Sequence, residues 1–361
     1  MIRIEDEQDY LIHLIYCSIH GKEPIEIPKS LSIKKVFEHA KRHEVAQLAY
    51  DAASIVLDSN MLKLWKEAYM HAVVRETEQN TAYQEVMKAF NEADIQTLEV
   101  QGTVTKQYYP KPYLRMMSDI DIIIAKDTID KAGKILQRLG YEIQKNEYKS
   151  QLDAKRGNIY FEFHTHYFDG SDKEEYELPE PFSEVPLTPL TMYKLHLLHT
   201  IKHLHNKGIG IRRIVDLYYI EERLKPKANI EEVDNTLKKA GLYNKKEKLI
   251  AISNYWFNDG PFPKGAEKII EEIKASGNHG TQEILFKHEI NARSDQSKIG
   301  YFLSLVFAPK ERICMAYPEC EGWPLIICWA YRIFKIVTVK EKRDYMKRFI
   351  KKLKDVKVKN K

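Results

Sequence analysis

Cysteine is scarce in this chain of 361 residues, and its pattern excludes the common cysteine-based architectures. None of the four cysteines belongs to a Cys-x-x-Cys pair, and the acidic first residues do not resemble a secretory signal. We therefore expect reduced thiols in a cytoplasmic protein. A zinc site formed by Cys314, Cys320 and Cys328 is an alternative. Their spacing matches no common zinc motif, which favours buried and unreactive thiols.

Long apolar runs and a strong net charge are also lacking. The most apolar stretch, at 323–339, is at most 17 residues long and contains Arg332 and Lys335. A membrane span needs about 20 apolar residues with few charges, so we expect a core helix here and no membrane span. The net charge of +5 is too small to indicate a nucleic-acid partner by itself.

One segment departs from this even mixture of charges. The tail at 340–361 holds eleven Lys or Arg and three Asp or Glu. It could contact RNA or a membrane surface. The interpretation that we favour is an amphipathic helix that docks through its apolar residues, which are Tyr345, Phe349, Ile350 and Leu353.

What the chain does have is helical periodicity on both sides of a short region with strand periodicity. Apolar residues at helical spacing predict helices at 8–20, 33–53 and 61–93, and the last of these is long enough to bend or to form a hairpin. Beyond a proline-rich linker at 180–189, they predict further helices at 191–205, 211–223, 231–240, 246–257, 266–275, 299–307, 310–316 and 324–337. We therefore divide the chain into a helical region at 1–94, a core at 95–187, and a helical region with a basic tail at 188–361.

The core region has the pattern of a small sheet. Alternating residues predict strands at 95–100, 119–125 and 159–168, and a third strand, in chain order, beginning at 141–143. An amphipathic helix at 128–139 separates two of these strands. The fold class expected is α+β.

Two carboxylates open the second predicted strand. Asp119 and Asp121 lie two residues apart, and therefore on the same side of a strand, with their backbones roughly 6.5–7 Å apart. Ile120, Ile122 and Ile124 then face the core. Carboxylates placed in this way can hold Mg²⁺, which typically uses one or two carboxylates together with substrate phosphates.

Two further features extend this candidate site. Glu162 lies in a strand whose alternate residues are aromatic, and it could supply the third carboxylate of a two-metal site. Gly102 and Thr103 follow the first predicted strand, where a glycine lets the backbone approach a phosphate and a helix N-terminus offers free N–H donors. The order of these elements along the chain is a more specific signal for a metal and phosphate site than any one element alone.

This order resembles the DNA polymerase beta-like nucleotidyltransferases, and within them a bacterial family of uncharacterised nucleotidyltransferases. The resemblance is strongest at 98–166 and spans nearly the whole chain. The matching residues are Gln101-Gly102, Tyr109-Pro110, Arg115, Ser118 to Asp121, Leu139 to Tyr141, Glu162 to His164, His199, His203, Arg213, Asp216, 307–309, 317–318 and 331–332.

The resemblance implies a mixed-sheet nucleotidyltransferase core with attached helical regions. It also implies that a nucleoside triphosphate binds with Mg²⁺ (or Mn²⁺), that an acceptor hydroxyl attacks the α-phosphorus, and that pyrophosphate leaves. The implied catalytic and metal-binding residues are Asp119, Asp121 and Glu162, with Glu162 as general base. The implied nucleotide-binding residues are Gly102, Thr103, Lys106, Arg115 and Ser118.

The family usually has a lysine before the glycine, where this chain has Gln101. If that lysine contacts a phosphate, Lys106, Lys111 or Arg115 could replace its charge.

Histidines and arginines outside the core add candidate contacts. His196, His199 and His203 recur on one helical face, where they could bind zinc, contact the nucleotide or acceptor, or pack at an interface. His164 and His166 could bind metal beside Glu162, although orienting Glu162 or the acceptor is the favoured role. Arg212 and Arg213 together could hold a phosphate, or Arg213 could instead pair with Asp216.

The function expected is therefore transfer of a nucleoside monophosphate, from ATP or another triphosphate, to a hydroxyl of a small molecule or an RNA. The first alternative is a degenerate member that binds a nucleotide or a partner without transfer, which Gln101 alone supports. The second is a metal-dependent hydrolase that uses Glu162, His164, His166 and the histidines at 196–203.

Overall fold

The computed structural model forms two compact units. It describes residues 2–146, 151–167, 178, 181–182, 188–206, 208–278, 280, 307–310, 313–314, 317–339, 343 and 347. The first unit comprises residues 1–204 and 209–279, and the second comprises residues 205–208 and 280–361. The linker and the helices predicted at 180–189, 299–307 and 310–316 fall largely outside the described residues, as does the basic tail.

Three short helices begin the first unit: α1 (Glu7–His20), α2 (Ile33–Arg42) and α3 (Ala46–Val56). The Asp6 side chain caps α1 by accepting hydrogen bonds from the backbone N–H groups of residues 8 and 9. The prediction of one helix at 33–53 is wrong. The chain turns at Glu44, whose φ of +53° is incompatible with a continuous right-handed helix. This turn brings the Glu44 carboxylate into contact with Arg212 and Asn278.

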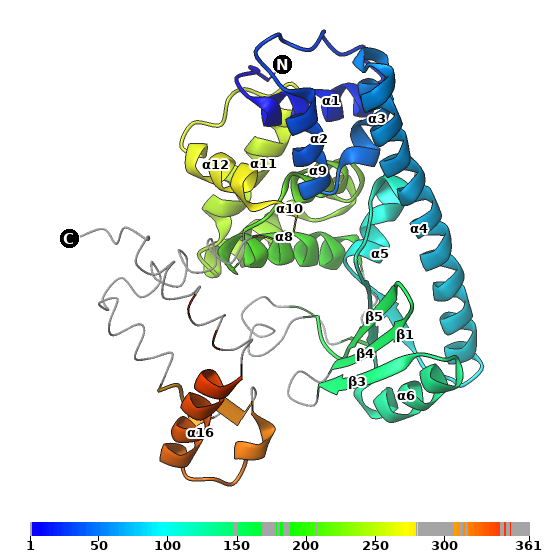
Figure 1. Ribbon diagram of the computed structural model, residues 1–361, viewed down its shortest axis with the longest axis vertical. Coiled ribbons are helices and arrows are strands. Elements are labelled where there is room, and N and C mark those ends of the chain that lie inside the picture. The colour runs from blue at the N-terminus through cyan, green and yellow to red at the C-terminus, as the bar shows by residue number, and fades with distance from the viewer. Residues whose placement is uncertain are drawn as a thin grey trace, which may run out of the picture. The chain divides into compact units, whose positions relative to one another are not determined.

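The run predicted at 61–93 forms one continuous helix, α4 (Ser59–Asn91), of 33 residues. At 1.5 Å per residue it is about 50 Å long. Trp65 in its first half belongs to the hydrophobic core of the helical region, whereas Val86 and Phe90 in its second half belong to the core beneath the sheet. Figure 1 shows α4 running from the N-terminal helices to the sheet. The two cores are therefore joined along a single helix.

Five strands form one mixed sheet in the order β1-β2-β5-β4-β3. Their bounds are β1 (Thr97–Glu99), β2 (Ile120–Ile124), β3 (Glu142–Asn146), β4 (Gln151–Arg156) and β5 (Ile159–His164). Only β2 and β5 pair in parallel. The sequence prediction missed β4, because only Leu152 and Ala154 on this strand are buried and two small or medium apolar residues give a weak alternation.

The two faces of the sheet have different neighbours. Ile120, Ile122 and Ile124 are buried together with α6 (Ile129–Arg138) and the second half of α4, as the alternation in the sequence predicted. Ile123 faces the other way and joins the core of the helical region. Asp121 shares this second face, because side chains alternate along a strand. The α+β fold class is confirmed.

The helices after the core are α8 (Pro189–Asn206), α9 (Ile211–Arg223), α10 (Ile230–Lys239), α11 (Tyr243–Phe257) and α12 (Glu267–Ser276). Their buried apolar residues form one cluster with those of α1, α2 and α3. Tyr10 and Leu14, for example, share this cluster with Ile214 and Trp256. The two helical regions of the first unit thus form a single core, which lies over the Asp121 face of the sheet.

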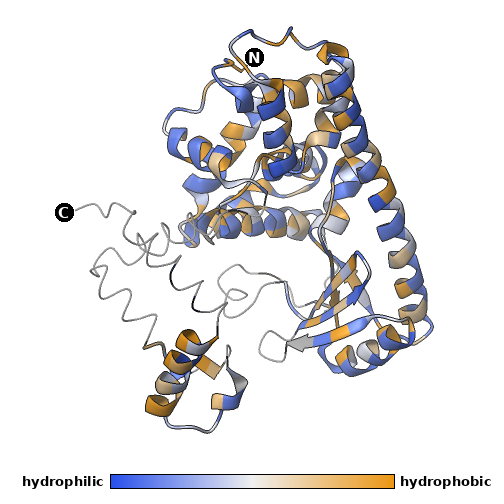
Figure 2. Cartoon of the chain, in the orientation of Figure 1, coloured by the Kyte–Doolittle hydropathy of each residue, from blue (hydrophilic) through white to orange (hydrophobic). Residues whose placement is uncertain are grey.

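The second unit contains the short helix η6 (Pro318–Cys320) and α16 (Leu325–Thr338). All four cysteines of the chain are free and buried, and three of them belong to the apolar cluster of this unit. We predicted a core helix here, but only its Cys328 is buried, whereas Ile326, Phe334 and Val337 are exposed. Figure 2 shows the hydrophobic character of this helix. No helix in the described part of the chain combines the length and apolarity needed to cross a bilayer.

Candidate active site

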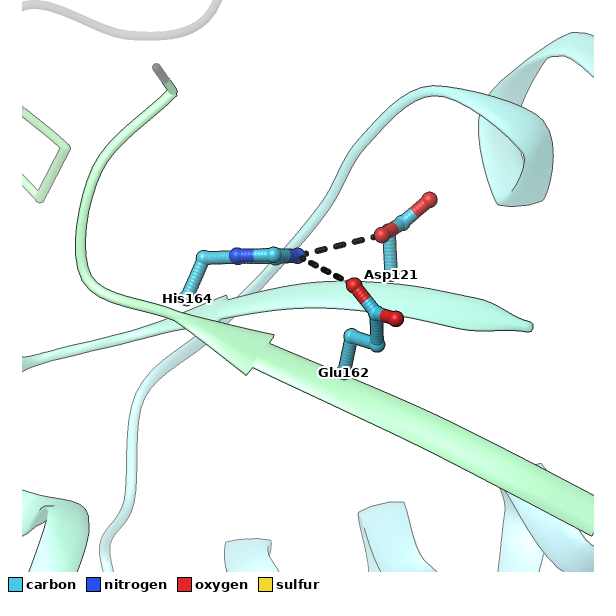
Figure 3. Close-up of side chains that lie close together, drawn as sticks. All are labelled: Asp121, Glu162 and His164. Carbon is cyan, nitrogen blue, oxygen red and sulfur yellow. Dashed lines mark hydrogen bonds and ion pairs between the residues drawn. The ribbon is translucent and has the colours of Figure 1, made fainter. Parts of the chain in front are cut away.

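Two acidic side chains meet where the parallel strands β2 and β5 lie side by side. Asp121 and Glu162 are register partners on these strands. His164 follows on the same face of β5, with its Nε2 3.1 Å from Asp121 Oδ1 and 3.6 Å from Glu162 Oε2. Figure 3 shows the three side chains converging. Among the residues that the structure describes, they are the one group of three or more potential metal ligands with atoms mutually within 4.8 Å.

Asp119 lies one residue before β2, beside this group and not within it. Ser118 Oγ donates a hydrogen bond to Asp119 Oδ1 over 3.2 Å. Burial and the negative charge of Asp121 raise the pKa of Asp119. The sequence predicted Asp119, Asp121 and Glu162 as metal ligands. The structure brings the second and third together, keeps Asp119 within electrostatic reach, and adds His164 to the close group.

The charge of this cluster is poorly compensated. Burial, together with the charges of Asp119 and Asp121, raises the pKa of Glu162 to about 7. Gln151 Nε2 donates to Glu162 Oε2 over 3.2 Å and thereby orients the oxygen that faces His164. Carboxylates that repel one another in a partly buried site are typical of functional centres, and a bound cation relieves the repulsion. The donor set of two or three carboxylates and an imidazole fits a divalent metal.

The predicted phosphate turn lies at the end of β1. Gly102 begins α5 (Gly102–Thr105), and the preceding Gln101 has a φ of +51°. A Cβ atom on Gly102 would lie 2.5 Å from an Nη atom of Arg115 and 2.8 Å from Met117 Sδ, so this position has no room for a side chain. The Thr103 hydroxyl is buried and has no hydrogen-bond partner within the described structure. At this turn, a phosphate could therefore approach the backbone of Gly102 closely, and the Thr103 hydroxyl could donate a hydrogen bond to it.

Two of the three cations expected to replace the missing lysine, Lys106 and Arg115, pair with carboxylates of the protein. Lys106 Nζ lies 3.0 Å from Glu76 Oε1. Arg115 donates two hydrogen bonds to Asp216 on α9, at 3.1 Å and 2.9 Å. Burial alone would raise the pKa of Asp216, but the charge and hydrogen bonds of Arg115 lower it to about 2. Nucleotide contacts by Lys106 and Arg115 therefore remain predictions.

Comparison with protein families assigns the chain to a family. The family model described as "Uncharacterised nucleotidyltransferase" matches residues 29–258, which is more than half of the chain and includes every site residue named above. The chain belongs to this nucleotidyltransferase family. Comparison with curated proteins gives no match.

Solved structures resemble this nucleotidyltransferase only distantly. The antibiotic-resistance factor ANT(2'')-Ia is 13% identical with a TM-score of 0.34, over 50% of this chain and 98% of that chain. A tRNA-processing enzyme is 11% identical with a TM-score of 0.24, over 76% of this chain and 97% of that chain. The Thermotoga maritima CCA-adding enzyme is 12% identical with a TM-score of 0.21, over 84% and 85%. At these scores the likenesses do not define an acceptor.

In this nucleotidyltransferase, the loop that leads into Asp119 is held by side chains of the helical regions. Arg75 on α4 donates to the carbonyl oxygens of Met117 and Ser118, at 2.9 Å and 3.0 Å. Gln79, one turn further along α4, also donates to Met117 O. Arg212 on α9 donates to the carbonyl of residue 116, over 2.6 Å. The position of Asp119 thus depends on both helical regions.

Sequence reasoning missed these supporting contacts, because nothing in a helical pattern identifies which carbonyl a buried arginine contacts. It singled out Arg212, together with Arg213, only as a candidate phosphate contact. The helix propensity and periodicity of α4 are the same whether Arg75 is a solvated surface residue or donates hydrogen bonds to the loop before Asp119. The only available signal was an arginine near the buried stripe of a long amphipathic helix.

The predicted histidines lie along α8, next to the phosphate turn. His196 is buried, and its Nδ1 lies 3.3 Å from the hydroxyl oxygen of Thr105 on α5. His199 Nε2 lies 2.5 Å from His203 Nε2, and the buried His199 Nδ1 has no partner among the described residues. His196 and His199 line a small pocket together with Gln101 and four apolar or aromatic residues, which are Val100, Tyr167, Met192 and Leu195.

Arg213 is a cation at this site that has no protein partner among the described residues. Its side chain is half-buried and makes no hydrogen bond or ion pair with the part of the chain that the structure describes, so the alternative of a direct Arg213–Asp216 pair is not observed. Burial lowers the pKa of Arg213 to about 10, against the opposing charges of Asp216 and Asp121. Its charge in turn adds to the burial that lowers the pKa of His199. A desolvated cation near Asp121 is suited to bind an anionic substrate.

Proposed function

We propose that this nucleotidyltransferase moves a nucleoside monophosphate from a nucleoside triphosphate to a hydroxyl group of an acceptor, with release of pyrophosphate. The observation that carries the proposal is the pairing of Asp121 with Glu162 across two parallel strands, with Asp119 adjacent. Asp119, Asp121 and Glu162 would hold the divalent cation, Mg²⁺ or Mn²⁺. When bound, such a cation neutralises phosphate charge and lowers the pKa of an attacking hydroxyl.

The residues of the chain then have distinct roles. The acceptor oxygen forms a bond to the α-phosphorus while the bond to the β-phosphate oxygen breaks, and pyrophosphate leaves. We assign acceptance of the hydroxyl proton to the carboxylate of Glu162, which lies beside Asp121 on the adjacent parallel strand. Gly102 allows the triphosphate to approach the backbone, and the free Thr103 hydroxyl donates to it.

The remaining contacts come from the helical region. Arg213 supplies a positive charge to the triphosphate. Lys106 and Arg115 are less suited to this role, because each already pairs with a carboxylate of the protein. His199 presents its unpartnered Nδ1 to the nucleotide or the acceptor, with His203 against its other nitrogen. The acceptor is a small molecule or an RNA, and the experiment below separates the two.

The test uses each of the four triphosphates labelled at the α-phosphate, incubated with the protein, Mg²⁺ or Mn²⁺, and either the RNA or the small-molecule fraction of a cell extract. Label should enter one acceptor fraction with the wild type. It should not do so with an Asp119→Asn/Asp121→Asn variant. Asp127→Asn, which changes an exposed carboxylate outside the site, is the matched control and should remain active.

Two results would overturn the proposal. Triphosphate binding without transfer to either fraction would indicate a degenerate, binding-only protein. Transfer that survives in the double variant would place the chemistry elsewhere in the chain. Circular dichroism of each variant establishes that loss of activity does not reflect loss of folding.

A further inference from the structure

The pairing of β5 with β2 explains why the His164 side chain lies beside Asp121 and Glu162. It is two residues after Glu162 on β5, so both side chains project from the same face of the sheet. Its register partner on β2 is Ile123, two residues after Asp121. The imidazole therefore reaches back along both strands toward the carboxylates, and Figure 3 shows its Nε2 directed between them.

The separations between these atoms match those of ligands around a single ion. Ligand atoms about 2.1 Å from a six-coordinate cation and at right angles to one another are about 3 Å apart. His164 Nε2 lies 3.1 Å from Asp121 Oδ1 and 3.6 Å from Glu162 Oε2. Small side-chain adjustments would bring all three atoms into contact with one cation. An imidazole used only to orient a carboxylate needs one such contact.

We propose that His164 Nε2 is a direct ligand of the cation held by Asp121 and Glu162, and that this nitrogen makes the site select Mn²⁺ over Mg²⁺. Magnesium strongly prefers oxygen ligands, whereas first-row transition ions accept imidazole nitrogen. The nitrogen ligand thus confers a metal preference that three carboxylates alone would not. The inference rests on the proposed function only in placing the metal between Asp121 and Glu162.

The decisive measurement is electron spin-echo spectroscopy of Mn²⁺ bound to the full-length protein, which detects nitrogen nuclei coordinated to the ion. The wild type should show coupling to ¹⁴N. His164→Gln should abolish the coupling, and His166→Gln, which changes the next histidine of the strand end, should retain it. If His164→Gln does not fold, His164→Asn provides the same comparison, and a wild-type spectrum without ¹⁴N coupling would by itself overturn the assignment.

Metal affinities provide a second readout. By calorimetry, the wild type should bind Mn²⁺ at least ten-fold more tightly than Mg²⁺, and His164→Gln should lose roughly 10–100-fold in Mn²⁺ affinity with a much smaller change for Mg²⁺. A histidine that only positions Asp121 would weaken both ions equally. Equal weakening, Mn²⁺ binding without nitrogen coupling, or coupling that persists in His164→Gln would each overturn the assignment.

These outcomes are separable from those of the proposed function. Nitrogen coupling in a protein that transfers no nucleotide would remove the proposed function and leave the metal assignment intact. Nucleotide transfer by a protein whose bound Mn²⁺ shows no nitrogen coupling would do the reverse.

Discussion

Breaking the buried ion pair between Arg115 and Asp216 should cost a large and measurable part of the free energy of unfolding. Both side chains are almost fully buried, with exposed fractions of 4% and 5%. Replacing Asp216 with alanine leaves the Arg115 guanidinium desolvated and unpaired beneath Gly102. Breaking a buried pair in this way costs about 3–5 kcal/mol. The pKa of Asp216, lowered from 3.8 to about 2, corresponds to a stabilisation on the order of 2–3 kcal/mol at neutral pH.

Urea denaturation of Asp216→Ala at pH 7, followed by circular dichroism, should therefore show a loss of about 3–5 kcal/mol. Tyr109→Phe removes only one hydrogen bond to Asp216, at 2.7 Å, and should lose about 1 kcal/mol. A variant in which Arg115→Met accompanies Asp216→Leu should lose less than Asp216→Ala, because no charge remains buried without a partner.

The pH dependence has a defined sign. The pKa of Asp216 is lower in the folded state than in the unfolded state, so the stabilisation is complete above about pH 4 and is lost as the pH falls toward 2. The difference between wild type and Asp216→Ala should shrink over this interval. A loss below about 1 kcal/mol at pH 7, or a difference that does not change in acid, would refute the reasoning.

Three further predictions concern the site itself. The pKa of Glu162 is raised from 4.5 to about 7, so ionisation of this carboxyl group destabilises the metal-free fold as the pH rises between these values. In thermal denaturation with EDTA, Glu162→Gln should therefore be more stable than the wild type by about 1–3 kcal/mol at pH 8. At pH 4 the two proteins should be equally stable. Gly102→Ala should lose about 1–3 kcal/mol because its Cβ would displace Arg115, whereas Gly133→Ala, which has room for a Cβ in a helix, should be neutral or stabilising; equal effects would contradict the packing. Arg213→Ala should raise the KM for the triphosphate about 10–100-fold without loss of stability in denaturation, since its charge has no partner in the part of the chain that the structure describes, and an unchanged KM would exclude the contact.

Local patterns in the sequence predicted much of the fold. The bounds of α9 were predicted without error, because its apolar spacing is regular and a glycine and a proline lie just outside it. The alternation at 119–125 predicted both the burial of the isoleucines and the exposure of Asp121 to the opposite face. Where the local signal was weak, as on β4 with its two buried residues, the strand was missed.

Long-range contacts account for what the sequence did not reveal. The break at Glu44 follows from a turn whose carboxylate contacts Arg212, 168 residues away in the chain. Likewise, Arg115 was predicted to contact phosphate, but its partner Asp216 lies 101 residues further along. The inclusion of His164 in the closest acidic group depends on the parallel pairing of β2 with β5, which periodicity alone does not determine.

Nucleotidyl transfer at the site of Asp119, Asp121 and Glu162 can be tested by following the α- and γ-phosphates of one triphosphate in the same reaction, with the acceptor fraction present. We expect that the α-label enters the acceptor, that the γ-label appears only in pyrophosphate, and that one pyrophosphate forms for each nucleotide transferred. Appearance of the γ-label in the acceptor, or release of inorganic phosphate without transfer of the α-label, would contradict this expectation.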